Sequence, residues 1–189
     1  MYNDLMSSLN LSVFESIYNF GHRNPFLAGV AIFFAQYLPY FLVLAFLILV
    51  FMQKGPRRKL YLFCEGALAV ILSRGIIATI IYFFYFHARP FAMLGFAPLI
   101  SEMGSSFPSG HMAWFFALSV SVWCVNRKWG IWFFALSFLM GIARIYVGIH
   151  WPLDILGGIV IGAVSGIFLH WILRDARDGL GNPAGGASV

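Results

Sequence analysis

The sequence predicts an all-α integral membrane bundle of about five transmembrane helices, with one further helix at the N-terminus that lies in the membrane interface. Apolar residues make up 61% of the 189 residues and charged residues only 10%, and the mean hydropathy is +0.84. Soluble domains have an apolar share of roughly 45–50%, so a soluble fold has no room to bury this much hydrocarbon. We therefore expect a single membrane-embedded domain over residues 1–178.

Residues 1–24 mix apolar and polar side chains and do not form a continuous apolar run. Leu9, Val13 and Ile17 recur at helical spacing, with asparagine, serine and acidic residues between them and before them. This pattern is typical of a helix that lies in the plane of the interface and does not cross the membrane.

Five apolar runs follow, and most are close to the ~20 residues that a helix needs to cross a bilayer. The expected spans are approximately 26–52, 60–86, 109–127, 130–147 and 154–173. The third run is the shortest, and its start is expected near the interface. Close packing against another helix is expected at the glycines of the last span, which are Gly157, Gly158, Gly162 and Gly166. The Gly/Pro/Ala-rich segment 179–189 is expected to be a disordered cytoplasmic tail.

The net charge of +5 is concentrated in short clusters between the apolar runs. Lysine and arginine gather in 54–59, in 127–128 and in 174–177. Such clusters mark cytoplasmic loops under the positive-inside rule, whereas a nucleic-acid-binding protein carries a continuous basic face. Alternation of the spans then places 87–110 and 147–153 together on the extracytoplasmic side. The lipid bilayer is therefore the expected partner, and nucleic acid is not.

Three short polar fragments border the apolar runs, and all fall on the side opposite to the basic clusters. They are His87-Ala88-Arg89-Pro90, Pro108-Ser109-Gly110-His111, and Arg144 followed by His150 and Asp154. Ionisable side chains inside or beside membrane spans are expensive and usually functional. Together these fragments offer guanidinium groups, imidazoles, a carboxylate and free backbone N–H groups. This set suits the binding and transfer of a tetrahedral oxyanion.

The third fragment supplies a candidate nucleophile. Asp154 follows His150 within the first turn of the fifth expected helix, where a carboxylate can hold one imidazole nitrogen and leave the other free. Arg144 lies near the outer end of the fourth span, where an unpaired cation is costly. Taken alone, these residues also fit an interfacial Arg–Asp pair with a neighbouring surface histidine.

The second fragment precedes an apolar helical run. Ser109 fits the N-cap position of that helix, and the first N–H groups of a helix bind phosphate. Gly110 allows an anion to approach the backbone closely, and His111 is positioned to donate a proton. An ordinary capped helix with a surface histidine is the alternative for this fragment alone.

The first fragment places Arg89 just outside the second span. Its planar guanidinium suits phosphate oxygens, although a single arginine at this position is more often an interface anchor. Because topology puts three such fragments on one face, a shared phosphate site is the better interpretation.

The three fragments, in this order, resemble the signature of the type 2 phosphatidic acid phosphatase superfamily. That signature reads K-x6-R-P, then P-S-G-H, then S-R-x5-H-x3-D. The second motif is complete at 108–111, and the third keeps Arg144, His150 and Asp154 at the full spacing. Three ordered motifs are much more specific than any one of them.

The resemblance implies a role for each matching residue. His150 would be the nucleophile and form a phosphohistidine, Asp154 would orient it, and His111 would protonate the leaving oxygen. The phosphoryl oxygens would be held by Arg89, Ser109, Gly110 and Arg144. Phosphoryl transfer depends on in-line attack and charge stabilisation. With two arginines present it requires no metal ion and no other cofactor.

Two positions depart from the signature. Tyr82 stands where the lysine of the first motif is expected, and Ala143 stands where the serine of the third is expected. The missing lysine removes one phosphate-binding cation, which His87 is close enough in sequence to replace in part. Within the superfamily, this absence is associated with bacterial undecaprenyl pyrophosphate phosphatases.

The resemblance therefore implies a lipid phosphatase of the bacterial cytoplasmic (inner) membrane whose site faces the periplasm. Undecaprenyl pyrophosphate, a lipid carrier of envelope biogenesis, is the expected substrate. Phosphatidylglycerophosphate, phosphatidic acid and lipid A are alternatives, as is phosphotransfer to a second lipid. A transporter of anions or lipids would use the same cations without catalysis. A metal hydrolase would recruit His87, His111, His150 and Asp154, whose spacing matches no recognisable zinc pattern.

Two charged residues of the second span stand outside these motifs. Glu65 and Arg74 are nine residues apart (74 − 65), hence on roughly opposite faces of a helix, so they are not expected to pair. Arg74 is expected to find its partner on another helix.

Overall fold

The protein is described by a computed structural model over residues 2–21 and 24–179, and every regular element in these ranges is helical. The first half contains α1 Tyr2–Asn19, α2 Pro25–Ile32, η1 Phe33–Tyr37, α3 Leu38–Met52, α4 Pro56–Val70 and η2 Ile71–Ala78. The second half contains α5 Thr79–Phe84, α6 Pro90–Leu94, α7 Gly110–Val125, α8 Arg127–Tyr146 and α9 Pro152–Gly179. The tail expected to be disordered falls, from residue 180 onward, outside the described residues.

The expected multi-pass membrane bundle is confirmed. Within the described residues, four helical stretches are long and apolar enough to cross a membrane, namely Pro25–Met52, Pro56–Phe84, Arg127–Tyr146 and Pro152–Arg174. A fifth apolar helix, α7, is shorter, as its sequence predicts. The second span begins earlier than expected because Pro56 starts the helix, where a missing N–H costs nothing. Its basic residues therefore lie in the first turn of the helix and not in a loop.

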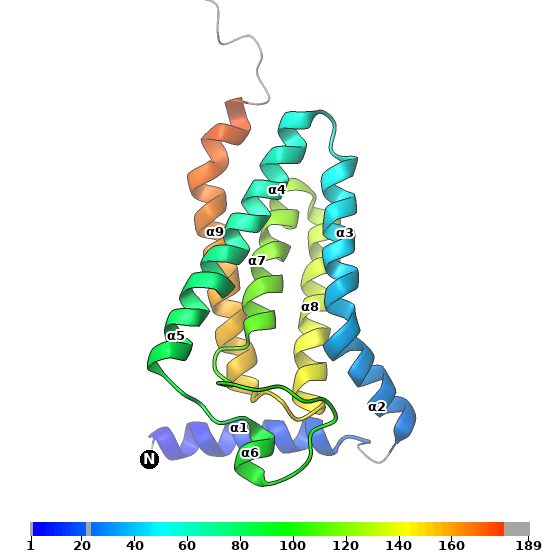
Figure 1. Cartoon of the computed structure of the whole chain (residues 1–189), viewed down its shortest axis with the longest axis vertical. Coiled ribbons are helices and arrows are strands. Elements are labelled where there is room, and N and C mark those ends of the chain that lie inside the picture. The colour runs from blue at the N-terminus through cyan, green and yellow to red at the C-terminus, as the bar shows by residue number, and fades with distance from the viewer. Residues whose placement is uncertain (1, 22–23, 180–189) are drawn as a thin grey trace, which may run out of the picture.

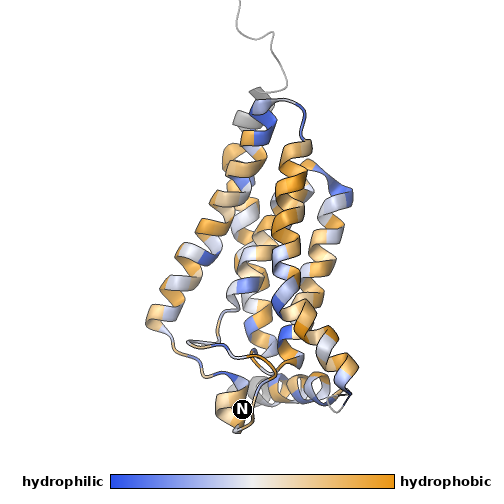
Figure 2. Cartoon of the chain, turned by 45° about the vertical axis from the view of Figure 1, so that its right-hand side comes forward, coloured by the Kyte–Doolittle hydropathy of each residue, from blue (hydrophilic) through white to orange (hydrophobic). Residues whose placement is uncertain are grey.

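The membrane helices run side by side, and α1 lies across one end of them (Figure 1). The α3–α4 and α7–α8 turns lie at the far end, and the connections from α5 to α7 and from α8 to α9 lie beside α1. Apolar residues dominate the length of the bundle, and hydrophilic residues concentrate near its ends (Figure 2). The basic clusters and the three polar fragments thus occupy opposite ends of the bundle.

α7 is the central helix, with most of its residues buried, and it packs most extensively against α9 and α8. The expected close packing of the α9 glycines is confirmed. A Cβ on Gly158 would overlap the carbonyl oxygen of Ser109, and a Cβ on Gly162 would lie 2.5 Å from that of Ala113. The glycines therefore allow the start of α9 to lie directly against the start of α7.

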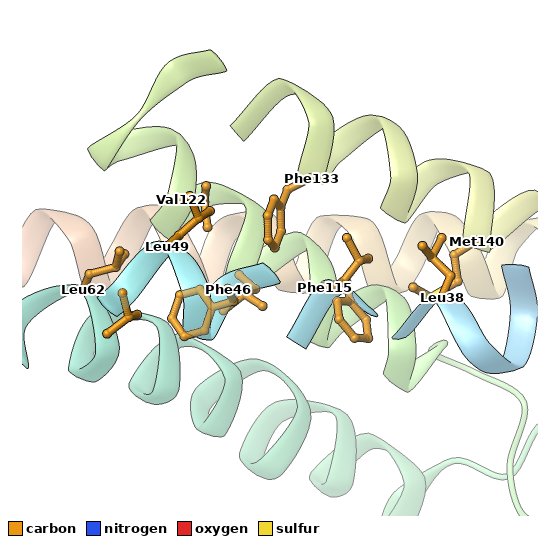
Figure 3. Close-up of a cluster of buried hydrophobic side chains, with 11 residues drawn as sticks. Leu38, Phe46, Leu49, Leu62, Phe115, Val122, Phe133 and Met140 are labelled. Carbon is orange, nitrogen blue, oxygen red and sulfur yellow. The ribbon is translucent and has the colours of Figure 1, made fainter. Parts of the chain in front are cut away.

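The larger apolar core joins α3, α4, α7 and α8 (Figure 3). Among its members, Leu42, Leu62, Phe115, Phe133 and Met140 are at most 2% exposed. Burying a large apolar side chain contributes about 1.5–3 kcal/mol, so this cluster holds the outer helices around α7.

A second apolar cluster fastens α1 across the end of the bundle. Phe14 of α1 is 1% exposed and packs with Met112 and Trp151. The ring centroids of Phe14 and Trp151 lie 5.1 Å apart. In addition, the backbone N–H of Leu153 donates to Oδ1 of Asn10 at 3.0 Å. The N-terminal helix thus supports the loop that joins α8 to α9.

Two of the spans contain a π-helical segment. In the first span, Pro39 lacks an N–H, so it cannot bond the carbonyl oxygen of Ala35 four residues earlier, within η1. In the second span, the hydroxyl of Thr79 donates to the carbonyl oxygen of Arg74, within η2, at 3.2 Å. Such wide turns occur frequently at functional sites, and residues of both segments reach the site described below.

Candidate active site

The three polar fragments of the sequence converge at the end of the bundle that α1 crosses. The backbone N–H of Ser109 donates to the carbonyl oxygen of Asp154 at 2.9 Å, which joins the second fragment to the third. Nη1 of Arg89 donates to the carbonyl oxygen of Ile149 at 2.9 Å, which joins the first to the third. Residues from three separate loops therefore form one site.

His150 is buried, and its two ring nitrogens face different groups. Nδ1 lies 3.4 Å from Oδ2 of Asp154, and Nε2 lies 3.5 Å from Nη2 of Arg144. A carboxylate beside Nδ1 favours the tautomer protonated there, so that Nε2 carries the lone pair and faces Arg144. Burial lowers the pKa of His150 below its ordinary value, and the opposing effect of Asp154 is smaller. The neutral imidazole that results is the form able to attack an electrophile.

Asp154 is fully buried and is held by several donors. Its Oδ2 accepts hydrogen bonds from the hydroxyl of Ser106 at 2.5 Å and from the backbone N–H of Trp151 at 2.8 Å. Its Oδ1 lies 3.2 Å from Nδ1 of His87. A fully connected network of this kind fixes the carboxylate, and with it the orientation of His150.

The structure places His87 at the site, where its Nδ1 contacts Asp154. Its partial replacement of the cation missing from the first motif stays a prediction. Ser106, which directly follows Ser105 in the loop before α7, also contacts Asp154 and was given no role from sequence. Its proximity to the second motif was the available signal.

Arg144 is 2% exposed and is paired on both sides. Nη1 donates to the carbonyl oxygen of Ala35 at 3.2 Å, and Nη2 forms an ion pair with the carboxylate of Glu102. The Ala35 carbonyl is available because Pro39 leaves it without its helical donor. The π-helical segment η1 thus positions one of the predicted phosphate-binding residues.

Arg89 is also buried, and it binds mainly backbone. Its guanidinium donates to the carbonyl oxygens of Met103, Gly104, Ser105 and Ile149, at distances between 2.9 and 3.3 Å. Nη2 lies in addition 3.4 Å from Oε1 of Glu102. In this arrangement Arg89 ties the loop before α7 to the loop before α9 and presents one edge to the site.

Glu102, which belongs to none of the three fragments, occupies the space between the two arginines. Burial raises the pKa of Glu102, but the positive charges of Arg144 and Arg89 outweigh that effect, so the pKa lies below its ordinary value. The ionised carboxylate stands where an anion is favourable, and a phosphate that reaches both arginines must displace it. A single glutamate in a polar loop carries no sequence signal for such a position.

The second motif forms the start of α7. Ser109 occupies the N-cap position, as predicted, but its side chain makes no capping hydrogen bond. Within the described residues its buried Oγ has no hydrogen-bond partner. Gly110 begins the helix, and a Cβ there would overlap the side chain of Arg74. His111 follows, half-buried and close enough to Glu102 to influence its charge.

One group of three potential metal ligands is found in the described ranges, and it lies away from this site. Ligand atoms of Glu65, Cys124 and His170 are within 4.8 Å of one another. Glu65 is fully buried and its Oε1 lies 2.7 Å from Nδ1 of His170, which agrees with the expectation that it does not pair with Arg74. Cys124 lies near the far end of α7, so this group is remote from His150.

A buried, oriented imidazole beside two guanidinium groups and a helix start is chemically suited to phosphoryl transfer inside a membrane bundle. The PAP2 superfamily matches residues 63–178, and the chain belongs to this family. It is a membrane-bound lipid phosphatase, and the resemblance inferred from its three motifs is confirmed.

Several known proteins are similar over most of its length. The bacitracin transport permease protein BcrC of Bacillus licheniformis is 32% identical over 167 residues, which cover 87% of this chain and 81% of that protein. The undecaprenyl-diphosphatase BcrC of Bacillus subtilis is 29% identical over 170 residues, covering 88% and 85%. The crystal structure of Aquifex aeolicus LpxE superposes with a TM-score of 0.70 at 30% identity, covering 85% of this chain and 94% of that one.

Proposed function

We propose that this phosphatase removes the terminal phosphate of undecaprenyl pyrophosphate at the outer leaflet of a bacterial cytoplasmic membrane. The observation that carries the chemistry is the pairing of His150 with Asp154, which leaves Nε2 free beside Arg144. The choice of lipid is supported by the name of the Bacillus subtilis relative, an undecaprenyl-diphosphatase. The absence of the lysine at Tyr82 agrees with the same choice.

In the proposed reaction, Nε2 of His150 attacks the terminal phosphorus, and the bond from that phosphorus to the bridging oxygen breaks. The leaving oxygen of the lipid monophosphate takes a proton from His111, which must enter this step as the imidazolium that the negative charge of the bound pyrophosphate stabilises. Water then attacks the phosphohistidine, with His111 accepting its proton, and inorganic phosphate is released. His150 returns to its neutral state, so the cycle consumes one water for each phosphate formed.

The charge of the transferring group would be balanced by the residues around it. Arg144 and Arg89 each point Nη2 at Glu102, and the phosphate oxygens would take the place of that carboxylate. The hydroxyl of Ser109 and the N–H of Gly110 add neutral donors at the start of α7. These fixed groups supply the electrostatic stabilisation that phosphoryl transfer requires, and no metal ion is needed for it.

The distribution of charge supports a site on the periplasmic side. The basic clusters at 54–59 and 127–128 lie at the opposite end of the bundle from His150 (Figure 1). Positively charged loops are retained in the cytoplasm, so the end that carries α1 and the site faces outward.

The test is phosphate release by the purified protein in detergent with a metal chelator present. Undecaprenyl pyrophosphate, phosphatidylglycerophosphate, phosphatidic acid and lipid A are compared as substrates. We expect hydrolysis of the pyrophosphate to be fastest, and His150→Ala to abolish it while keeping the wild-type melting temperature. Preference for another lipid would reassign the substrate. Recovery of the transferred phosphoryl group on a second lipid, in place of free phosphate, would indicate phosphotransfer. Full turnover by His150→Ala would exclude the phosphohistidine route.

A further inference from the structure

Arg74 is a membrane-embedded cation to which the proposed mechanism gives no role. It lies in η2 of the second span and is half-buried. Throughout the described ranges, its guanidinium forms no ion pair, and the contact found for it is with the ring of Tyr82, at 5.3 Å from the centroid. An arginine inside a span is costly unless it has a partner or a function, so the lack of an anionic partner calls for an explanation.

The side chain of Arg74 lies over the start of α7. A Cβ built on Gly110 would come within 2.8 Å of Cδ and 3.0 Å of Cζ of Arg74, as well as overlapping Nε. Gly110 is therefore the residue that allows this arginine to lie against the second motif. The first N–H groups of α7 have no acceptor within their own helix, so the guanidinium and these N–H groups favour the same anion.

Tyr82 holds this arrangement in place. Its hydroxyl donates to the carbonyl oxygen of Pro108 at 2.6 Å, which fixes the ring beside the second motif. The Arg74 guanidinium then lies over that ring, a contact that orients a planar cation without neutralising it. The tyrosine that replaces the expected lysine thus positions an arginine from earlier in the same span.

The backbone geometry of η2 is consistent with a functional role. The other π-helical segment, η1, provides the Ala35 carbonyl that positions Arg144. In η2 the hydroxyl of Thr79 donates to the carbonyl oxygen of Arg74 itself. Both wide turns therefore occur where a site arginine is placed, and such turns are maintained at a cost in helix stability.

We propose that Arg74 is a phosphate-binding residue of this site and supplies the cation that the first motif lacks. Its guanidinium, which lies against Gly110, binds an oxyanion at the start of α7 beside the first N–H groups of that helix, and so adds a third positive charge to those of Arg89 and Arg144. A pyrophosphate headgroup carries more negative charge than a monophosphate ester, and a third arginine suits it. The inference rests on the proposed phosphatase function.

The test compares Arg74→Gln and Arg74→Lys with a matched control. Arg127→Gln removes an arginine that also lies over an aromatic ring, that of Trp123 at 5.9 Å, but at the opposite end of α7. The measurements are kcat and KM with undecaprenyl pyrophosphate, and the binding of orthovanadate and inorganic phosphate followed by thermal shift. We expect Arg74→Gln to lower kcat/KM about 100-fold, the effect typical of losing one transition-state donor, and to weaken the binding of both anions.

Arg74→Lys is expected to restore part of both losses, because it keeps the charge without the planar fork. Arg127→Gln is expected to match the wild type. The inference would be overturned if Arg74→Gln bound both anions as tightly as the wild type and kept the wild-type kcat/KM. If the glutamine variant does not fold, Arg74→Met, which suits an apolar span, is measured in its place with the same criteria.

Anion binding requires no turnover, so the two hypotheses fail separately. A wild-type protein that hydrolyses none of the lipids refutes the proposed function, while vanadate and phosphate binding still decides whether Arg74 binds an oxyanion. A wild-type protein that hydrolyses lipid, with an unaffected Arg74→Gln variant, refutes the role of Arg74 alone.

Discussion

The charged residues of the site are paired with one another around His150. Asp154 binds one nitrogen of His150, and Glu102 neutralises the arginines near the other. Glu102 and Asp154 thus offset the charges of Arg89 and Arg144 without substrate, which lowers the cost of holding these two guanidinium groups in a buried position. Binding of a phosphate then exchanges one anion for another.

Replacing Glu102 by glutamine removes the anion that substrate must displace. We expect Glu102→Gln to lower the inhibition constant of orthovanadate on the order of tenfold, because a hydrogen bond to a charged group contributes about 1.5–3 kcal/mol. The constant is measured from inhibition of phosphate release, with Glu102→Asp as the variant that keeps the charge. Weaker inhibition in Glu102→Gln than in the wild type would show that the carboxylate assists anion binding.

The pH dependence of turnover should report the burial of His150. Burial disfavours the imidazolium and lowers the pKa of His150, so the neutral nucleophile persists as the pH falls through the ordinary imidazole range. We expect the acid limb of kcat to lie below that range, and activity to be lost only at more acidic pH. An acid limb at or above the ordinary imidazole pKa would contradict the buried, neutral state of His150.

At the scale of helices, the site depends on how closely α9 approaches α7. Gly158 lies against the carbonyl oxygen of Ser109, so the first turns of α9 are in direct contact with the second motif at the start of α7. The hydrogen bond from Ser109 N–H to the Asp154 carbonyl oxygen needs the same approach. The glycine therefore couples helix packing to catalytic geometry.

A methyl group at this contact should both destabilise the bundle and disturb the site. We expect Gly158→Ala to cost about 1–3 kcal/mol, as overpacking a close contact does, and to lower kcat. Gly29→Ala is the matched control, because a Cβ there meets nothing within 4 Å, and it should leave the melting temperature unchanged or raised. Thermal unfolding in detergent measures the melting temperatures of both variants. Equal melting temperatures would mean that α9 can shift to accommodate the methyl group without loss of stability.

At the scale of the whole molecule, α1 and the loops it supports close one end of the bundle. Phe14 packs against the loop of Trp151, and the basic clusters lie at the opposite end (Figures 1 and 2). This asymmetry defines an end that carries the site and an end that carries the positive charge. Under the positive-inside rule, the second of these supports the proposed orientation in the membrane.

The orientation can be tested by single cysteines in intact cells. In a background with Cys64 and Cys124 replaced by alanine, Ala97→Cys places a thiol in the loop before α7 and Lys54→Cys places one in the α3–α4 turn. A membrane-impermeant maleimide should label Ala97→Cys from outside, and should label Lys54→Cys only after the membrane is opened. The reverse pattern would place the site in the cytoplasm.

The helical membrane fold, the spans and the three polar fragments were predictable from the sequence because each is encoded locally. Hydropathy is averaged over about one span. The motif that contains Arg144, His150 and Asp154 is a short continuous stretch of chain, from the last turn of one helix to the first turn of the next. The limits of the spans were predicted less well where proline decides them, as at Pro56. The π-helical segments had no recognisable pattern.

Only the tertiary structure decided which residues of different fragments contact one another. The position of Glu102 between two arginines, the contact of His87 with Asp154 and the place of Arg74 over Gly110 each join residues from different helices or loops. Such contacts depend on how closely α7 and α9 pack and on which carbonyl a proline leaves free, and no local pattern of residues encodes either. The sequence by itself therefore determined a membrane protein with the residues of a phosphatase, and packing determined which charges neutralise one another and which remain available to a phosphate.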